Sequence, residues 1–381
     1  MALRVLTFNV WDLPWPVSRH RQRRMRVIAR RLPELGCDIA AFQEVWSEDA
    51  RSVLIEAGRD DGLEHVWHRP NALGGSGLLV LSRLPIRSQS FTRYVLCGLP
   101  QRLLHMDYYS GKGLALLSLT TDEGSLTFVN THLHARYGRY ARTEDEYLGH
   151  RASEIVQLAT ALASHDEPAV VVGDFNVTEG SPEYAILLGL TGLEDSAAQL
   201  DARQTTAVPD NPYRVRGRPG TRIDYVFTRA GVGRSAAARA VERVLDEPLE
   251  IDGEEASYSD HAGVIAEIEL ARGPSSLPRP TPEALEQAHV LLDQGREIAR
   301  RRRSRTRAWG GAVSGIAMLG SAAAWRGPLP RRGFLRVAAI GLPALALTGG
   351  TAAMALEEGF VRNELRAYDD VQALLLELQR T

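Results

Sequence analysis

Runs of apolar residues that carry a polar side chain at one end recur along the first two thirds of the chain. The clearest is residues 168–176, P-A-V-V-V-G-D-F-N, whose consecutive apolar residues predict a strand buried on both faces. Gly173 then allows a sharp turn, so Asp174 and Asn176 follow at the carboxyl end of the strand. Other apolar runs carry such residues at Asn9, Glu44, His132, Asp224 and Asp260-His261. Strands that each deliver an acid, an amide or an imidazole at one end are typical of the crevice of an open α/β protein.

Segments with helical spacing alternate with these strands. Residues 20–35 repeat apolar side chains at helical spacing, and we expect the arginines of the other face to be solvated. Buried strands that alternate with helices predict the α/β class. The loop between the first strand and this helix, W-D-L-P-W-P, holds Trp11 and Trp15. These two rings either cap the core or face lipid, and both interpretations stay open.

The charge of the chain changes sign after residue 270. Residues 1–270 hold 29 basic and 37 acidic side chains, whereas residues 271–381 hold 16 basic and 10 acidic ones. An acidic front part is a poor electrostatic match for a nucleic-acid backbone, so we expect no nucleic-acid partner. The basic rear part suits an anionic membrane surface. The first strand begins near residue 4, so we also expect no signal peptide ahead of it.

Two uncharged apolar segments in the rear part predict a helical membrane hairpin. As helices, residues 308–325 and 337–356 would be roughly 27 and 30 Å long, close to the hydrocarbon thickness of a bilayer. Trp309 and Trp325 flank the first segment, and an arginine-rich collar at 300–307 precedes it. This pattern predicts an integral membrane protein whose catalytic domain lies on the cytoplasmic side, with the collar on the anionic surface. A soluble helical hairpin and a shallow re-entrant hairpin remain the alternatives.

The polar strand ends predict a metal-assisted phosphoester hydrolase. Asn9, Glu44 and Asp260 offer oxygen ligands, which suit Mg²⁺ far better than Zn²⁺, with Mn²⁺ as an alternative ion. Asp224 can accept a proton from His261 and set its tautomer, which leaves the other ring nitrogen to act as a general base on a water molecule. A bound cation polarises a phosphoryl oxygen and stabilises charge on the leaving oxygen. Each residue alone is weak evidence, and their joint order along the chain carries the prediction.

The ordered motifs resemble those of the endonuclease/exonuclease/phosphatase superfamily. The resemblance covers nearly all of residues 1–270 and rests on Asn9, Gln43-Glu44, Thr131-His132, Gly173-Asp174-Phe175-Asn176, Arg222-Ile223-Asp224 and Ser259-Asp260-His261. It implies a DNase I-like, four-layer α/β sandwich of two packed mixed sheets with outer helices. It also implies that Glu44 is the main metal ligand and that Asn9 and Asp260 support the metal site.

The same resemblance implies roles for the other site residues. Asp174 and Asn176 would position the nucleophile and the phosphate. His132 would stabilise phosphoryl charge, and Asp224 would orient the base, His261.

Within this superfamily, three features resemble the neutral sphingomyelinases and the inositol phosphosphingolipid phospholipases C: the insert at residues 96–113, the T-H-L-H-A run after it, and the C-terminal hydrophobic hairpin. This branch implies a sphingolipid substrate in a membrane, with sphingomyelin cleaved to ceramide and phosphocholine. A nuclease and an inositol-lipid phosphatase of the same superfamily are the alternatives, although the acidic core argues against a nuclease. Phe175 stands where leucine is commoner in the family, which is a conservative apolar change.

The insert also holds Lys112, which is the only lysine in the chain. All the other lysine or arginine positions of the chain hold arginine. A lysine here therefore suggests a position that needs a compact ammonium group, and a lysine retained by chance is the alternative. The resemblance to neutral sphingomyelinases suggests that Asp107 and Lys112 act as a switch. They would pair in one state and release groups toward the substrate phosphate in another.

These inferences divide the chain into four parts. We expect a metal-dependent phosphodiesterase domain at 1–272, a linker and basic helix at 273–307, a two-segment transmembrane hairpin at 308–356, and a C-terminal amphipathic helix at 357–381.

Overall fold

Two six-stranded sheets pack face to face in the computed structural model of the chain, which describes residues 2–69, 76–102, 105, 107–137, 145–326 and 333–380. The first sheet has the strand order β11-β14-β1-β2-β4-β3. Its strands are β1 (Ala2–Asn9), β2 (Ile39–Gln43), β3 (His65–His68), β4 (Leu79–Ser82), β11 (Arg234–Val244) and β14 (Gly263–Arg272). The second sheet has the order β5-β6-β7-β8-β10-β9. Its strands are β5 (Ile86–Arg93), β6 (Gly113–Thr121), β7 (Gly124–His132), β8 (Ala169–Asp174), β9 (Glu194–Asp195) and β10 (Asp224–Arg229).

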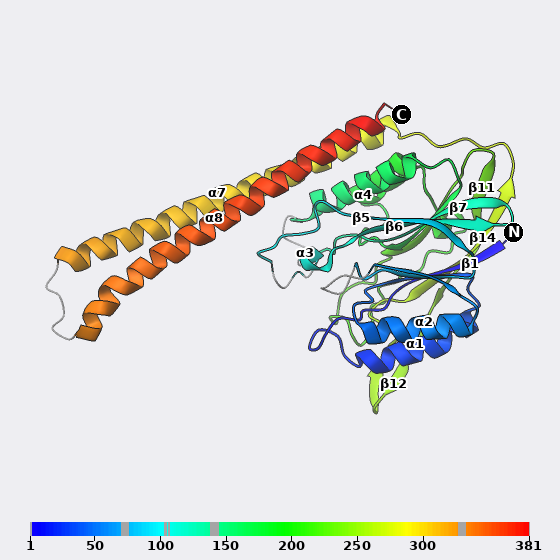
Figure 1. Cartoon of the computed structure of the whole chain (residues 1–381), viewed down its shortest axis with the longest axis horizontal. Helices are drawn as coiled ribbons and strands as arrows, with labels where there is room; N and C mark the ends of the chain where they lie inside the picture. The colour runs from blue at the N-terminus through cyan, green and yellow to red at the C-terminus, as the bar shows by residue number, and fades with distance from the viewer. Residues whose placement is uncertain are drawn as a thin grey trace.

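Each sheet is mixed, because it combines one parallel pair with antiparallel neighbours. The parallel pairs are β1 with β2 and β7 with β8, and both lie in the interior of their sheets. A short additional ribbon, β12 (Leu249–Ile251) with β13 (Glu254–Ala256), extends beyond the body (Figure 1). The carboxyl ends of the two parallel pairs define the part of the molecule where ligands bind in α/β proteins.

Helices cover the outer faces of both sheets. On one side lie α1 (Arg21–Leu35) and α2 (Glu48–Asp60), and on the other lie α4 (Leu148–Ala163) and α5 (Pro182–Thr191) (Figure 1). Two short helices, α3 (Asp107–Ser110) and α6 (Ser196–Gln199), sit in connections. Separate apolar clusters fill the space between the sheets and beneath each helical layer. The prediction of a mixed α/β fold with two packed mixed sheets and outer helices is confirmed.

The C-terminal part forms two long helices, α7 (Pro282–Arg326) and α8 (Gly333–Leu378), which pair with each other and project from the body as an arm (Figure 1). The base of this arm belongs to the core, since Leu285 and Leu292 of α7 and Val371 and Leu375 of α8 pack in the cluster beneath α4. β14 ends at Arg272, at the boundary expected for the catalytic domain. The division into four parts stays a prediction, but residues beyond that boundary complete the core.

The two expected membrane spans are not supported. Among the residues that the structure describes, none of the helices has both the length and the apolar character needed to cross a bilayer. The arginine-rich collar is also largely engaged within the arm: Arg303 and Arg307 pair with Glu358, and Arg302 pairs with Glu364. These ion pairs neutralise part of the positive charge of the collar with acids of α8. The expected connector between the spans, residues 327–332, lies outside the described residues.

Candidate active site

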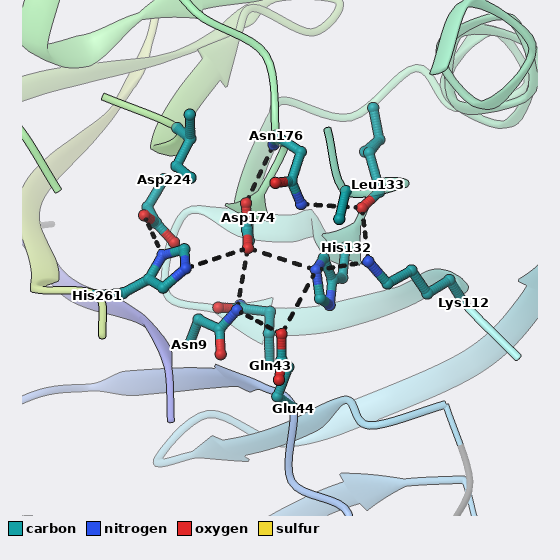
Figure 2. A network of polar contacts seen from close by, with 12 residues as sticks. Asn9, Gln43, Glu44, Lys112, His132, Leu133, Asp174, Asn176, Asp224 and His261 are labelled. Atoms are coloured by element: carbon teal, nitrogen blue, oxygen red, sulfur yellow. Dashed lines mark hydrogen bonds and ion pairs between the residues drawn. The ribbon is translucent and has the colours of Figure 1, made fainter. Parts of the chain in front are cut away.

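Strand register brings the predicted site residues together. Asn9 at the end of β1 is the Cα partner of Gln43 at the end of β2, so Glu44 follows beside it. His132 at the end of β7 is the partner of Asp174 at the end of β8. Asp174 is in turn opposite Asp224 at the start of the antiparallel β10. All of these chain ends therefore meet at one edge of the sandwich, as Figure 2 shows.

Unusual backbone conformations occur at this edge. Gly173 has φ of 147°, and a Cβ added there would lie 1.9 Å from the carbonyl oxygen of Thr131, so only glycine fits between β7 and β8. Glu44 and Asn176 have φ of 58° and 51°, in the left-handed region that side chains other than glycine rarely adopt. Such conformations are retained where the surrounding structure and the function of a site require them.

The Asn9 amide links two carboxylates from different sheets. Its nitrogen donates to Glu44 Oε1 at 3.1 Å and to Asp174 Oδ2 at 3.0 Å, and its oxygen accepts from the N–H of Trp11 at 3.0 Å. His132 Nε2 lies 3.4 Å from the same Asp174 oxygen and 4.0 Å from Glu44 Oε1. The centre of the site thus holds the buried Asp174 and the mostly buried Glu44 side by side, with His132 between them (Figure 2).

The acids fit a hard divalent cation. Among the described residues, Glu44 Oε2 is buried without a hydrogen-bond partner, and burial together with the charge of Asp260 raises the pKa of Glu44. A cation at this position would supply the missing contact, and oxygen donors are the ligands that Mg²⁺ prefers. A second grouping, Asp174, Asp224 and His261, has ligand atoms within 4.8 Å of one another. Asn9 presents its amide nitrogen to the acids, so its side chain would have to turn before its oxygen could bind a metal.

His261 and Asp224 form a close pair beside these acids. His261 Nδ1 lies 2.8 Å from Asp224 Oδ2, while Nε2 points toward Asp174 Oδ2 at 3.8 Å and Asp260 Oδ1 at 4.0 Å (Figure 2). Burial by itself would lower the pKa of His261, but the charges of Asp224, Asp260 and Asp174 outweigh it and raise that pKa well above its ordinary value. Burial and the neighbouring charge of Asp224 raise the pKa of Asp174 to about 7. The geometry leaves Nε2 available to receive a proton once the acids are neutralised by a cation.

Lys112 and Asp107 lie on the opposite side of the site and form a buried ion pair. Lys112 Nζ also donates to His132 Nε2 at 2.8 Å and to the carbonyl oxygen of Leu133 at 2.9 Å (Figure 2). The same carbonyl accepts the Asn176 amide at 3.1 Å. Because an ammonium group can only donate, this contact makes His132 Nε2 an acceptor and places the ring proton on Nδ1.

Two opposing effects act on the carboxylate of this pair. Burial would raise the pKa of Asp107, but the charges of His134 and Lys112 and hydrogen bonds from Lys112 and Tyr137 bring it well below its usual range. Burial, with the charge of Lys112, lowers the pKa of His132 well below its ordinary value. The ion pair is therefore held in its charged form next to a neutral imidazole.

Arg24 is a structurally important residue that the sequence reading missed. We expected the arginines on the outer face of this helix to be solvated and did not single out Arg24, which is fully buried and donates to the carbonyl oxygens of Val10, Trp11 and Tyr258. It thereby ties the chain after β1 to the segment before His261. Its position four residues before Ile28, on the same helical stripe, was the signal in the sequence.

A buried polar cluster between the sheets was also missed. Gln43 donates to Thr7 Oγ1 at 3.1 Å and to Asn130 Oδ1 at 2.8 Å, and Asn130 donates to the Phe42 carbonyl at 3.1 Å. This cluster lies next to Glu44 and joins β1 and β2 of the first sheet to β7 of the second by hydrogen bonds. Gln43 belonged to the motif, but the sequence contains no signal for its partners, which become neighbours only when the sheets pack.

Comparison with known proteins supports the family expected from the sequence. The model of the "Endonuclease/Exonuclease/phosphatase family" matches residues 6–261. A "Putative neutral sphingomyelinase" of Drosophila melanogaster is 32% identical over 278 residues, which are 71% of this chain and 61% of the relative. An "Inositol phosphosphingolipids phospholipase C" of Schizosaccharomyces pombe is 36% identical over 295 residues, 69% of this chain and 67% of the relative.

The fold is also found among solved structures. Sphingomyelinase C from Streptomyces griseocarneus superimposes with a TM-score of 0.53 at 22% identity, covering 70% of this chain and 99% of that one. This likeness concerns the fold alone. The match to the Drosophila protein, in contrast, spans about three fifths of that relative's length. Together, the matched family model and the sequence relatives establish that this chain belongs to the endonuclease/exonuclease/phosphatase family, in its neutral sphingomyelinase-like branch.

Proposed function

We propose that this protein is a Mg²⁺-dependent phosphodiesterase that hydrolyses sphingomyelin, or a related phosphosphingolipid, to ceramide and the phosphorylated head group. The observation that carries the proposal is the placement of the His261–Asp224 pair on one side of Asp174 and the Glu44 carboxylate, whose Oε2 lacks a hydrogen-bond partner among the described residues, on the other. A general base that can activate a water molecule and a carboxylate that can bind a cation thus lie on either side of the buried Asp174. Metal-assisted hydrolysis of a phosphodiester uses both groups. The sphingolipid class is supported by the names of the relatives.

We assign each residue of the site a separate role in this reaction. His261 Nε2 takes the proton from a water molecule whose oxygen attacks phosphorus, and Asp224 holds Nδ1–H and stabilises the imidazolium that forms. The bond from phosphorus to the ceramide oxygen breaks, that oxygen takes a proton from a water molecule to give ceramide, and the proton on His261 returns to solvent. Asn176, held by the Leu133 carbonyl, orients the phosphoryl group together with Asp174. Mg²⁺, held by Glu44 with support from Asn9 and Asp260, would neutralise charge on the phosphoryl and leaving oxygens.

We also propose that the arm formed by α7 and α8 keeps the protein at a lipid surface. Its far part exposes Trp309, Ile316 and Leu319, which are 75%, 71% and 74% accessible. Large apolar side chains of this kind are costly in water and favourable at the boundary between headgroups and acyl chains. Arg300 and Arg305 of the collar are exposed and would face anionic headgroups, whereas the remaining collar residues pair within the arm. Placement of the catalytic domain on the cytoplasmic side stays a prediction.

A substrate panel tests the reaction. Purified protein would be incubated with vesicles of sphingomyelin, phosphatidylcholine or inositol phosphoceramide and with supercoiled plasmid, each with Mg²⁺ or with EDTA. We expect Mg²⁺-dependent release of phosphocholine or of phosphoinositol from a sphingolipid. The panel also compares His261→Ala with the control His165→Ala, because His165 is partly exposed in the segment before β8, at the end of this strand away from the site. Plasmid nicking without lipid hydrolysis would identify a nuclease instead and would refute the proposal.

The arm has its own test. Because its base completes the core, whole-arm deletion would expose buried leucines, so only residues 308–356 should be replaced by a short Gly-Ser connector. The pairing of Arg307 with Glu358 brings the two cut ends together. We expect the shortened protein to cleave a water-soluble phosphodiester normally and vesicles poorly. Equal rates on vesicles would show that the arm has no part in lipid access.

A further inference from the structure

Two loops beside the active site expose a set of apolar and basic side chains, which we call the rim patch: Trp15, Val17, Val215, Arg216 and Arg218. Trp15 is 85% accessible, the highest value among the large apolar side chains that the structure describes, and Val17 and Val215 are 54% and 62% accessible. Apolar residues exposed singly are ordinary on soluble proteins. Three of them on two adjoining loops, with two exposed arginines, form a patch that needs an explanation.

The two loops are fastened to each other. Arg19 donates to the Pro212 carbonyl at 2.7 Å, His20 Nδ1 lies 3.2 Å from the Tyr213 hydroxyl, and the ring centroids of Trp11 and Tyr213 are 5.3 Å apart. The structure separates the two tryptophans, although a lipid-facing role for either one stays a prediction. Trp11 packs inward on Tyr213, whereas Trp15 projects into solvent from the same loop. The patch is therefore held in place before any partner binds, which reduces the entropy lost on binding.

Both loops adjoin the catalytic strand ends. The N–H of Trp11 donates to Asn9 Oδ1, which anchors the first loop two residues after the end of β1. Asn211 at the start of the second loop donates to the Ser259 carbonyl at 2.7 Å, two residues before His261. A surface that contacts the rim patch would therefore lie next to the place where the phosphoryl group is expected.

We propose that the rim patch is a membrane-contact surface that docks on a bilayer containing anionic lipid and presents the active site to it. Tryptophan favours the interface between headgroups and acyl chains, and arginines beside it attract anionic headgroups. The second loop also carries one exposed acid, Asp210, and the acids of the β12–β13 ribbon pair with His20 and Arg23. Figure 1 shows the dark-blue loop after β1 projecting to the same side as the far end of the arm.

Position-specific fluorescence tests this proposal directly. Trp15→Cys, Val17→Cys and Val215→Cys would be labelled with a polarity-sensitive dye in the full-length chain. The native cysteines do not interfere, because Cys37 and Cys97 are buried and burial raises the pKa of the Cys37 thiol to about 12. Val232→Cys is the matched control, because Val232 is similarly exposed, at 58%. It lies in the β10–β11 turn, which contacts Asp166 in the segment before β8 and is not part of the rim patch.

Vesicles of phosphatidylcholine with and without phosphatidylserine would be added in the absence of Mg²⁺. We expect a blue-shifted emission at positions 15, 17 and 215 with phosphatidylserine and none at position 232. Arg216→Gln with Arg218→Gln should weaken this response roughly tenfold on anionic vesicles and leave it unchanged on neutral ones. No shift at positions 15 and 215 would overturn the proposal and would leave a protein partner as the occupant of the patch.

Activity measurements separate the docking surface from the proposed reaction. Membrane docking does not depend on that reaction, whereas the role of docking in presenting the active site to lipid rests on it. Trp15→Ala should lower hydrolysis of vesicle sphingomyelin by about tenfold and leave hydrolysis of a water-soluble phosphodiester unchanged. A wild-type protein that shifts its label on vesicles but hydrolyses no sphingolipid would disprove the reaction and keep the docking surface. Equal loss on both substrates would indicate a disturbed active site and refute the docking role of Trp15.

Discussion

The ammonium nitrogen of Lys112 lies 2.8 Å from Nε2 of His132, at the carboxyl end of β7. The same ammonium is paired with the buried carboxylate of Asp107, so the insert between β5 and β6 is joined to the phosphoryl side of the site. The compact ammonium contacts an imidazole, a carboxylate and the Leu133 carbonyl, and a planar guanidinium on a longer side chain would not reproduce the same three contacts.

The Lys112 and Asp107 side chains should therefore affect activity and stability together. Lys112→Met, which removes the donor to His132, and Lys112→Arg, which replaces a compact ammonium by a broad guanidinium, should each lower kcat by about 10- to 100-fold. Asp107→Ala should also destabilise the protein by about 3–5 kcal/mol, since it leaves a buried ammonium unpaired. The double variant Asp107→Ala with Lys112→Met should be more stable than Asp107→Ala alone. Urea unfolding and steady-state kinetics measure both effects, and a Lys112→Arg enzyme with normal turnover on vesicles would show that any cation suffices.

His261 and Asp224 should act as one unit in the chemical step. His261→Ala should lower kcat by at least ~10², because the proton acceptor is lost, while Mg²⁺ affinity stays nearly constant. Asp224→Asn should reduce kcat by a comparable factor, since the amide cannot stabilise the imidazolium. Combining the two changes should cost little more than the larger single effect. Additive losses in the double variant would mean that the two residues act independently.

Glu44 should govern the magnesium requirement. Glu44→Gln removes one anionic ligand, so the Mg²⁺ concentration for half-maximal activity should rise at least ~10-fold. Burial and the charge of Asp260 raise the pKa of Glu44, so its charged form destabilises the fold when no cation is bound. The neutral Gln variant should therefore melt at a higher temperature than wild type in EDTA at pH 8. Added Mg²⁺ should raise the melting temperature of wild type more than that of the variant. The exposed Glu56→Gln change is the control, and an unchanged magnesium requirement would remove Glu44 from the metal site.

Glu154 on α4 should make stability depend on pH. Its Oε2 accepts the N–H of His134, and burial raises the pKa of Glu154 to about 8. The neutral form is therefore the one favoured in the fold. Its stabilising contribution is complete below a pH of about 4.5 and is lost as the pH rises toward 8, with a slope of up to ~1.4 kcal/mol per pH unit.

Glu154→Gln isolates this effect. The free energy of unfolding of wild type minus that of the variant should fall between pH 5 and pH 8, as measured by urea unfolding at several pH values. The exposed Glu286→Gln variant should track wild type throughout. A constant difference between wild type and Glu154→Gln would show that Glu154 does not take up a proton in the fold.

Much of the site was predictable from the sequence, because strands carry their own signal. The valines of residues 168–172 and the polar residues after each apolar run mark the ends of β1, β2, β7 and β8. Their convergence follows from the parallel pairing of those strands, which places carboxyl ends at one edge. The family and the mixed α/β fold were therefore determined by local patterns and their order.

Tertiary structure alone decided the remaining features, because they depend on contacts between residues far apart in the chain. Arg24 is buried only because three carbonyl groups from two separate segments surround it. The uncharged stretches near residues 308 and 337 suggested spans by their length, but the pairing of α7 with α8 and the packing of their bases under α4 place them in an arm of the folded domain. The local sequence gives the apolar surface that a segment can remove from water. Only the tertiary structure determines whether protein or lipid covers that surface.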